Sequence, residues 1–240
     1  MMNYFFVTGT SRGIGKSIVD NLLNDESNYI IGLSRHNTFK HERFEHIRID
    51  LREIESVKNY RFIKIIDANS ITLINNSGMI ASKHVGNIDN QSIIDVFNVN
   101  IIAPFLLVNN FINAYQHISV KKLILNISSG AGRTPMESWS SYCASKSALD
   151  MLSQVVFKEQ EHFKDPISIK VLSIAPGIVD TQMQEEIRKS DKMDFKMLDT
   201  FIKYKDENLL ASTDDTAKKL INVMNQSGHF LEPLFDLREL

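Results

Sequence analysis

The chain has 240 residues, and 27 Lys and Arg against 29 Asp and Glu give it a formal net charge of −2. This length suits one large α/β domain, and a composition of 43% hydrophobic and 23% charged residues excludes a disordered chain. The near-neutral charge argues against a general nucleic-acid binder. The one cysteine, Cys143, excludes an internal disulfide and a cysteine-based zinc site.

Targeting and metal-binding signals are missing from the sequence. No apolar run approaches the length of a membrane span. Residues 1–6 lack the basic leader and cleavage site of a signal peptide. The seven histidines show no metal-ligand spacing. We therefore expect a soluble cytoplasmic protein without a metal ion.

Short apolar runs alternate with helix-length segments along the chain. In chain order we expect strands at 4–8, 29–33, 46–49, 71–75, 123–127, 168–174 and 235–237, and helices at 13–24, 53–68, 91–117, 141–163 and 214–226. Thr213 or Asp214 is the expected N-cap of the last helix. The alternation predicts an α/β fold, a Rossmann-type doubly wound parallel sheet of about seven strands with helices on both faces, in a single domain of residues 1–240.

Two stretches break this alternation. Residues 36–45 follow the second strand and are too short and polar for a full crossover helix. Residues 181–210 are long, charged and dotted with Met and Phe, so we expect one or two small helices off the main sheet. Insertions of this kind often cover a site, and the sequence predicts a substrate lid at 181–210.

The first strand runs into a glycine-rich turn, Thr8-Gly9-Thr10-Ser11-Arg12-Gly13-Ile14-Gly15. Its glycines permit a sharp turn and a close approach to a pyrophosphate, and the next helix presents its first N–H groups to the phosphate. A plain tight turn would also be rich in glycine. The position between the first strand and the first helix favours a dinucleotide site.

The residues after the second and third strands bear on the choice of cofactor. An NAD-selective site usually has an acid after the second strand, whereas this chain has Ser34 and Arg35, with Arg12 in the glycine turn. Arginines suit a 2′-phosphate, so the three residues favour NADP, although each arginine alone would be read as a solvated surface charge. Asp50, before Leu51, could accept a hydrogen bond from the adenine amino group; an N-cap for the next helix explains it equally well, and the two roles are compatible.

A possible catalytic pair follows the fifth strand. Tyr142 and Lys146 are four residues apart and share a helix face. A nearby ammonium lowers the pKa of a tyrosine by favouring the phenolate, which general acid–base chemistry requires. Ser129, at a strand end, could hold a carbonyl oxygen. Without further context, a surface tyrosine lying over a lysine stem is the better interpretation.

The motifs together supply that context, because they resemble the single-domain branch of the short-chain dehydrogenase/reductase family over essentially the whole chain. They are Thr8-Gly9-x-x-x-Gly13-x-Gly15, Asn75-Asn76-Ser77-Gly78, Asn100, Ser129, Tyr142-x-x-x-Lys146 and Pro176-Gly177, in the family's order and spacing. Ser77 stands where the family usually has Ala, and we expect the extra hydroxyl to be tolerated.

The resemblance implies a role for each motif residue. Tyr142 donates a proton to the carbonyl, Ser129 polarises it, Lys146 binds the nicotinamide ribose and lowers the pKa of Tyr142, and Asn100 holds a water that links Lys146 to solvent. The implied cofactor is NADP(H). Its expected binding residues are Gly9, Ser11, Arg12, Gly13, Ile14, Gly15, Ser34, Arg35, Asp50, Leu51, Asn76, Gly78, Tyr142, Lys146, Pro176, Gly177, Val179 and Thr181.

Local stretches are more particular and resemble one subgroup of the family, the bacterial benzil reductases that form (S)-benzoin, which are similar to sepiapterin reductases. The resemblance implies NADPH-dependent reduction of a vicinal diketone to an α-hydroxy ketone. Met136, Trp139 and Met183 would form an apolar substrate pocket. The alternative for all three is ordinary core or lid packing, which for Met183 is about as good an interpretation. Cys143 is expected to be a small packed residue rather than a nucleophile.

Other readings of the chain remain open. One is a reductase for a sepiapterin-like pterin or another ketone, and the other is an NADP-binding regulator without turnover. The partners expected are a small carbonyl substrate and a second copy of the chain, in a homodimer or homotetramer, with no nucleic acid and no membrane. The family's subunit interfaces use the helices expected here at 91–117 and 141–163.

Overall fold

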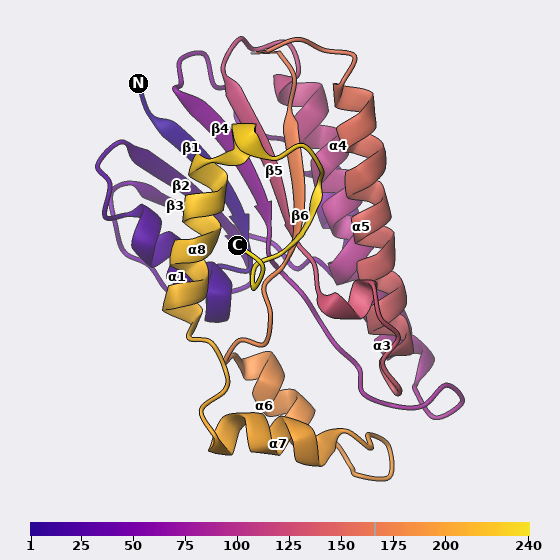
Figure 1. Cartoon of the computed structure of the whole chain (residues 1–240). Helices are drawn as coiled ribbons and strands as arrows, with labels where there is room; N and C mark the ends of the chain where they lie inside the picture. Colours follow the sequence, from indigo (N-terminus) through magenta and orange to yellow (C-terminus); the bar gives the residue numbers. More distant parts are fainter. Residues whose placement is uncertain (166) are drawn as a thin grey trace.

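A computed structural model describes residues 1–165 and 167–240 of the chain. Its centre is one parallel sheet with the strand order β3-β2-β1-β4-β5-β6-β7, shown in Figure 1. The strands are β1 (Asn3–Thr8), β2 (Asn28–Ser34), β3 (Phe44–Arg48), β4 (Ser70–Asn75), β5 (Lys121–Ile127), β6 (Lys170–Ala175) and β7 (Leu234–Asp236). The chain leaves β1 in one direction along the sheet and returns to β4 in the other, which places a topological switch point between these two strands.

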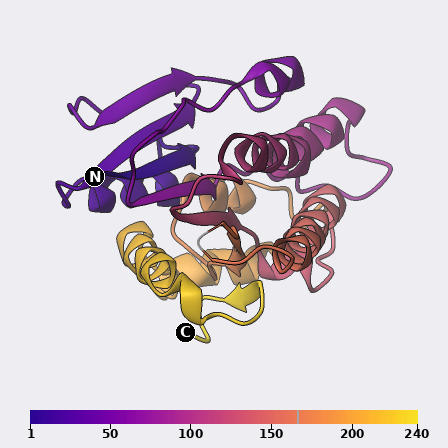
Figure 2. The same cartoon turned by 90° about the horizontal axis from the view of Figure 1, so that it is seen from above.

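Helices connect the strands and cover both faces of the sheet (Figure 2). They are α1 (Gly13–Leu22), α2 (Ile54–Asn59), α3 (Asn90–Phe97), α4 (Ala103–Tyr115), α5 (Ser140–Gln160), α6 (Gln182–Arg188), α7 (Leu198–Asp206) and α8 (Thr213–Asn225). A π-helical turn, Asn98–Ile102, joins α3 to α4, and short 3-10 turns lie at Gly130–Gly132 and Ser227–His229. The predicted doubly wound fold is confirmed.

The strands are apolar on both sides because each side contacts a different helical layer. Phe5 and Val7 of β1 belong to the core beneath α1 and α8, whereas Phe6 belongs to the core beneath α4 and α5. All three side chains are at least nine-tenths buried. This alternation follows from the strand geometry, which directs successive side chains to opposite faces, and it explains the continuous apolar runs of the sequence.

The stretch that follows α2 departs from the prediction. A helix was expected over 53–68, but the helix ends at Asn59 and the chain continues without regular structure to β4. Phe62 turns inward and contacts the ring of Phe6, with centroids 4.8 Å apart. Side chains replace the missing helical bonds: Tyr115 donates its hydroxyl to the Ile63 carbonyl at 2.7 Å, and Asn110 donates to the Tyr60 carbonyl at 3.2 Å.

Two expected helix caps are also wrong. The Ser212 hydroxyl, rather than Thr213 or Asp214, accepts the Asp215 N–H at the start of α8, at 2.9 Å. Asp50 does not cap α2, since the residue at that position is Glu53. Other boundaries shift by a few residues, and residues 35–43 contain no helix in the part of the chain described, as the sequence predicts.

The helix that runs through α3, the π-turn and α4 is continuous from Asn90 to Tyr115. Contrary to expectation, this segment is long and apolar enough to cross a membrane, with a mean hydropathy of 1.6 over an 18-residue window. It lies instead along the sheet, where Leu107, Phe111 and Tyr115 are fully or almost fully buried in the core. A core helix of a globular protein meets the same length and composition criteria.

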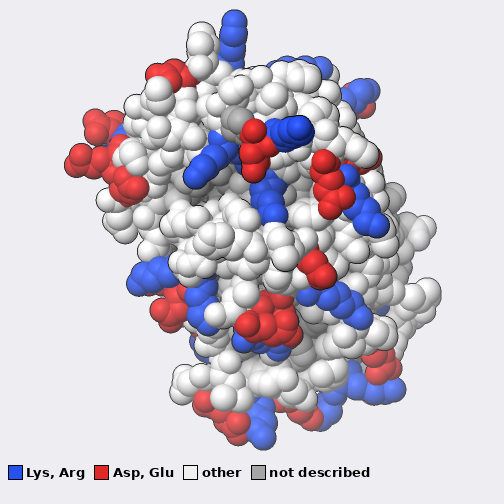
Figure 3. Space-filling model, turned by 45° about the horizontal axis from the view of Figure 1, so that its top comes forward, with Lys and Arg blue, Asp and Glu red and all other residues white. Residues whose placement is uncertain are grey.

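The predicted insertion forms two small helices, α6 and α7, which lie beyond the carboxyl ends of the strands, apart from the sheet (Figure 1). Ile187, Phe195 and Phe201 of this segment are buried in a third apolar cluster with Trp139 and Tyr142. The insertion therefore has its own small core, built against the start of α5. On the face shown in Figure 3, acidic and basic side chains are interspersed.

Replacing Tyr115 with Phe should leave the Ile63 carbonyl without its hydroxyl donor while preserving the ring packing. We expect a loss of about 1 kcal/mol in the free energy of unfolding, measured by urea denaturation. Tyr29→Phe, a substitution of the same kind in a half-buried tyrosine that is the second residue of β2, is the control. Equal stability of Tyr115→Phe and the wild type would show that the hydroxyl does not hold this segment.

Candidate active site

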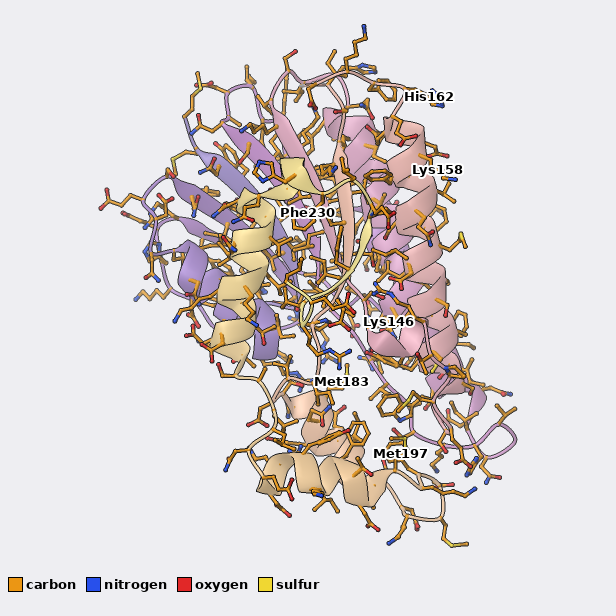
Figure 4. All side chains as sticks on the ribbon, viewed as in Figure 1. Lys146, Lys158, His162, Met183, Met197 and Phe230 are labelled. Atoms are coloured by element: carbon orange, nitrogen blue, oxygen red, sulfur yellow. The ribbon has the colours of Figure 1, made fainter. Side chains whose placement is uncertain are left out.

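A cleft of about 770 Å³ opens at the carboxyl ends of β1, β2, β4, β5 and β6. In Figure 4, Lys146 lies above Met183 and Met197 of the insertion, across this opening. Every candidate site residue from the sequence lines the cleft except Gly15 and Asn100. The parallel sheet brings them together, because all of its strands end on one edge and ligands bind beyond that edge at the switch point.

The glycine turn has the backbone geometry of a phosphate cradle. Gly9 and Gly13 have φ values of +72° and +57°, which favour glycine. The Thr8 hydroxyl accepts the N–H groups of Asn76 and Ser77 at 2.9 and 3.0 Å, and so joins the ends of β1 and β4. Gly13 and Ile14 of the first turn of α1 line the cleft, and no side chain of the described residues caps this turn, which leaves its N–H groups available to an anion.

Gly15 has a packing role rather than a lining role. A Cβ atom at this position would lie 2.3 Å from the Gly9 carbonyl oxygen and 2.4 Å from Nδ2 of Asn76. That same Nδ2 donates to the carbonyls of Thr8 and Gly9, at 3.0 and 3.3 Å. Gly15 therefore lets α1 start close against the strand edge, which is needed for its N–H groups to reach the cleft.

The residues proposed to select the cofactor lie at one end of the cleft. Ser34 is buried, and its hydroxyl accepts from Thr10 at 3.1 Å and donates to the His36 carbonyl at 2.8 Å. Arg35 is exposed and lines the cleft. Arg12 reaches toward the insertion, where its guanidinium hydrogen-bonds to the Gln182 side chain and lies 3.8 Å from Glu186.

Asp50 lies near Arg35, two residues beyond the end of β3. Arg52 donates from Nε and Nη2 to its carboxylate, at 3.1 and 2.6 Å, and this pairing holds the pKa of Asp50 below its usual value. The nearby charge of Arg35 acts in the same direction. Asp50 is therefore an anion at neutral pH and remains an acceptor, as the adenine role requires.

Tyr142 and Ser129 meet at the centre of the cleft. The tyrosine is 7% exposed. Burial raises the pKa of its hydroxyl, while a hydrogen bond with Ser129 opposes that shift. Ser129 comes from the end of β5, where its hydroxyl also accepts the Ala131 N–H at 3.2 Å. The pair can hold one carbonyl oxygen between two hydroxyl donors.

Lys146 lies one helical turn further along α5 and is 3% exposed. Its ammonium donates to the Ile127 carbonyl at 2.7 Å and lies 5.8 Å from the centre of the Tyr142 ring. Burial lowers the pKa of Lys146 to about 8, and the carboxylate of Asp150 opposes this shift. For Tyr142, burial is the largest influence on the pKa and raises it. The family resemblance implied instead that Lys146 lowers this pKa.

Asn100 lies behind the cleft, in the π-helical turn, and is completely buried. Its Oδ1 accepts the Met79 N–H and its Nδ2 donates to the Met79 carbonyl, both at 2.8 Å. Nδ2 also lies 3.0 Å from the Ser145 hydroxyl. Asn100 therefore ties the loop after β4 to α5 beside Lys146; its predicted water remains an expectation. Single π-helical turns in longer helices are frequent at functional sites.

The apolar wall of the cleft contains the predicted substrate residues. Met136 and Met183 are half-buried and line it, and Trp139 is 6% exposed. The indole ring stacks on Phe195 of the insertion, with centroids 5.3 Å apart, and its edge contacts Phe201 at 5.4 Å. Trp139 therefore packs against the insertion and also lines the cleft, and its role in binding a substrate stays a prediction.

Sequence reasoning missed several residues of the cleft. Gln184, Met197, Phe201 and Tyr204 enter it from the insertion, and the only signal for them was the long charged segment 181–210 with its scattered Met and Phe. Arg238 lies two residues beyond β7, and Asp236 holds its guanidinium with a bond of 2.8 Å to Nε. The convergence of strand ends could have identified Arg238, because β7 is parallel to its neighbour.

Comparison with known proteins identifies the family. The sequence profile described as "short chain dehydrogenase" matches residues 3–192. The chain therefore belongs to the short-chain dehydrogenase/reductase family and is an oxidoreductase that acts on CH–OH and C=O groups. Enzymes of this family use NAD(H) or NADP(H), and the glycine cradle and the uncapped start of α1 fit such a dinucleotide.

Individual relatives are similar over much of the chain. A benzil reductase ((S)-benzoin forming) of Bacillus cereus is 35% identical over 237 residues, 93% of this chain and 94% of the relative. The enzyme of that name from Bacillus subtilis (strain 168) is 33% identical, with 99% of each chain covered. A sepiapterin reductase of Meriones unguiculatus is 32% identical over 65% of this chain and 58% of its own.

Solved structures of the same fold include the KRED1-Pglu enzyme, with a TM-score of 0.80 and 23% identity, covering 98% of this chain and all of that one. A 4-hydroxyisoleucine dehydrogenase complexed with NADH gives a TM-score of 0.77 at 22% identity, covering 98% of this chain and 96% of that one. At these identities the likeness establishes the fold.

The buried ammonium of Lys146 predicts a pH-dependent effect on stability. Below pH 8 the lysine is charged in the folded and the unfolded chain, so burial of the charge opposes folding; above about pH 10.5 it is neutral in both states. Lys146→Met should therefore be more stable than the wild type at pH 7, by about 3 kcal/mol. The difference should shrink as the pH rises from 8 to 10.5.

Urea denaturation across this pH range measures the difference. Lys158→Met, which removes an exposed lysine of the same helix, is the control and should show no such trend. A stability difference for Lys146→Met that stays constant with pH would contradict the assigned burial of a charged group.

Proposed function

We propose that the protein is an NADPH-dependent carbonyl reductase that converts a vicinal, aromatic diketone such as benzil into an α-hydroxy ketone. The observation that supports it best is that Ser129, Tyr142 and Lys146 line one cleft, which the glycine turn borders, with the Lys146 ammonium 5.8 Å from the centre of the Tyr142 ring. The similarity to two benzil reductases over 93% or more of this chain supports the choice of substrate.

The chain's own groups supply the proton and hold the carbonyl. NADPH, when bound, supplies the hydride that the carbonyl carbon accepts. Ser129 and Tyr142 hold the carbonyl oxygen, and Tyr142 transfers its hydroxyl proton to that oxygen. Lys146, held by the Ile127 carbonyl, stabilises the phenolate that remains. A buried tyrosine that keeps its proton at neutral pH is suited to act as the acid.

The proposed preference for NADP depends on charge at the end of β2. Ser34 takes the place of an acid, and its hydroxyl is already engaged with Thr10 and His36. Arg35 and Arg12 can bring two guanidinium groups to a 2′-phosphate, and Arg12 would exchange its exposed contacts with Gln182 and Glu186 for the phosphate.

The proposed setting is the cytoplasm, where the single Cys143 would remain reduced.

We propose that the enzyme forms a homodimer or homotetramer through α4 and α5. These helices expose Phe105, Met151 and Val155, whose side chains are 46% to 58% accessible. Apolar side chains exposed together on adjacent helices are typical of an interface, and analytical ultracentrifugation measures the number of subunits.

The acid role of Tyr142 predicts that Tyr142→Phe lowers kcat/KM for benzil with NADPH by at least about a hundredfold, because the proton donor is lost. The measurement is NADPH oxidation at saturating cofactor. Tyr29→Phe serves as the control. The mechanism would be excluded if Tyr142→Phe turned over benzil as fast as the wild type does. A regulatory protein would be favoured if the wild type bound NADPH but turned over no carbonyl compound. Faster turnover of sepiapterin than of benzil would favour a pterin substrate.

The cofactor proposal predicts that Arg35→Asp lowers the ratio of kcat/KM with NADPH to kcat/KM with NADH by roughly ten- to a hundredfold. Loss of the guanidinium and repulsion of the 2′-phosphate act in the same direction. Lys158→Asp, which makes the same change in charge on the distant part of α5, should leave the ratio unchanged. An unchanged ratio for Arg35→Asp would refute the assignment of the 2′-phosphate site.

A further inference from the structure

Asp150 is a buried carboxylate beside the catalytic centre that the proposed mechanism does not use. It is 4% exposed. It follows Tyr142 and Lys146 on α5 at intervals of four residues, so the three side chains lie along one face of the helix. A buried carboxylate is costly unless other groups pair with it, so its partners indicate what it does.

The partners of Asp150 come from two other elements. The Arg133 guanidinium donates from Nε to one carboxylate oxygen at 3.0 Å, and the Ser173 hydroxyl of β6 donates to the other at 2.6 Å. Ser173 is completely buried, and its carbonyl lies 3.5 Å from Nη2 of Arg133. Asp150 therefore ties α5 to β6 and to the loop after β5 that carries Arg133.

The anchored loop is the one that carries Ser129. Its 3-10 turn, Gly130–Gly132, starts directly after Ser129 and ends directly before Arg133. The turn packs on the backbone of α5, because a Cβ atom at Gly132 would lie 2.9 Å from the Lys146 carbonyl carbon. A displacement of Arg133 would therefore move the Ser129 hydroxyl relative to the carbonyl oxygen that it holds.

Asp150 also acts on Lys146 through its charge. Burial lowers the pKa of Lys146, and the Asp150 carboxylate is the charged group that opposes this shift. Arg133 is paired with Asp150, and its charge also lowers the pKa of Asp236 at the end of β7. Tyr142, the other titratable group on this face of α5, keeps its proton because burial raises its pKa. Loss of the Asp150 charge would therefore leave the effect of burial on Lys146 unopposed.

We infer that Asp150 is a positioning residue for the proposed reduction, which anchors the Ser129 loop through Arg133 and supplies the counter-charge for the Lys146 ammonium. Asp150 itself does not line the cleft, so it acts through these neighbours. The inference rests on the proposed carbonyl-reductase function, in which Ser129 holds the carbonyl oxygen and a charged Lys146 stabilises the phenolate.

Two substitutions break the same ion pair but remove opposite charges. Asp150→Asn keeps the shape of the side chain, and the Arg133 side chain that it leaves unpaired is 31% exposed and can be hydrated. Arg133→Met removes the positive charge instead. Both should lower kcat for benzil with NADPH by roughly ten- to a hundredfold, because the Ser129 loop is no longer anchored. Arg133→Lys, which keeps a charge that can pair, should recover part of this loss.

The pH profile separates the charge of Asp150 from its anchoring role. In the wild type, kcat/KM should fall above a pH of about 8, where Lys146 loses its proton. Asp150→Asn should move this fall to lower pH by about one unit, because the opposite charge near Lys146 is lost. Arg133→Met keeps the carboxylate and should not move the fall to lower pH. Glu159→Gln, beside Lys158 at the end of α5 away from Lys146 (Figure 4), is the matched control and should change neither kcat nor the profile.

A stability measurement tests the counter-charge without turnover. Lys146→Met removes the buried ammonium, and the resulting gain in urea midpoint is compared in the wild-type and Asp150→Asn backgrounds at pH 7. The gain should be larger in the Asp150→Asn background, because the charge of Lys146 is harder to bury without its counter-charge. Thermal unfolding checks that each variant is folded.

Four results would overturn the inference. A fall moved to lower pH in both Asp150→Asn and Arg133→Met would assign the shift to a loosened loop rather than to charge. Unchanged kcat in both variants, or equal losses in Arg133→Met and Arg133→Lys, would show that the ion pair does not anchor Ser129. Equal gains in urea midpoint in the two backgrounds would show that Asp150 is not a counter-charge. If the wild type fails to reduce benzil, the proposed function fails instead, and the stability comparison still decides whether Asp150 and Lys146 interact.

Discussion

The junction of β1 and β4 is the constraint on which the rest of the structure depends. One hydroxyl, that of Thr8, accepts two backbone N–H groups from the end of β4, and the Asn76 amide bonds back to the turn after β1. The absence of a side chain at Gly15 lets α1 begin against this junction. The chain diverges here to the two halves of the sheet, so the same close packing creates the cleft and directs the first turn of α1 toward it.

Burial determines the chemistry on the opposite wall of the cleft. Tyr142 and Lys146 are both at most 7% exposed, and burial raises the pKa of the tyrosine while lowering that of the lysine. Each shift favours the neutral form. The tyrosine therefore keeps its proton and can donate it. The pKa of the lysine is about 8, so the lysine can gain or lose a proton near that pH. Burying these two polar groups costs free energy of folding, and the burial of the large apolar core around them offsets that cost.

The insertion is coupled to the catalytic residues through an aromatic contact. Phe195 and Phe201 pack on Trp139, and Trp139 packs on Tyr142. Movement of α6 and α7 would therefore displace Trp139 and, through it, the Tyr142 hydroxyl that donates the proton. Arg12 adds a second contact, because its guanidinium bonds to Gln182 of α6 at the entrance of the phosphate turn. The substrate and the cofactor would therefore both contact the insertion that carries α6 and α7, from two sides.

The sequence by itself determined the parallel, doubly wound α/β class and the glycine turn, because these depend on local periodicity and on spacing within single elements. The Tyr142-Lys146 pair took its role from the resemblance to a family, because its spacing alone suits a surface tyrosine better. It failed where distant side chains decide the outcome. The segment after Asn59 is not helical because Tyr115, Asn110 and the Phe62 packing satisfy it in another way. Likewise, only tertiary structure could place Gln184 in the cleft and leave the Trp139 N–H without an acceptor among the described residues, since burial is a property of what surrounds a group in space.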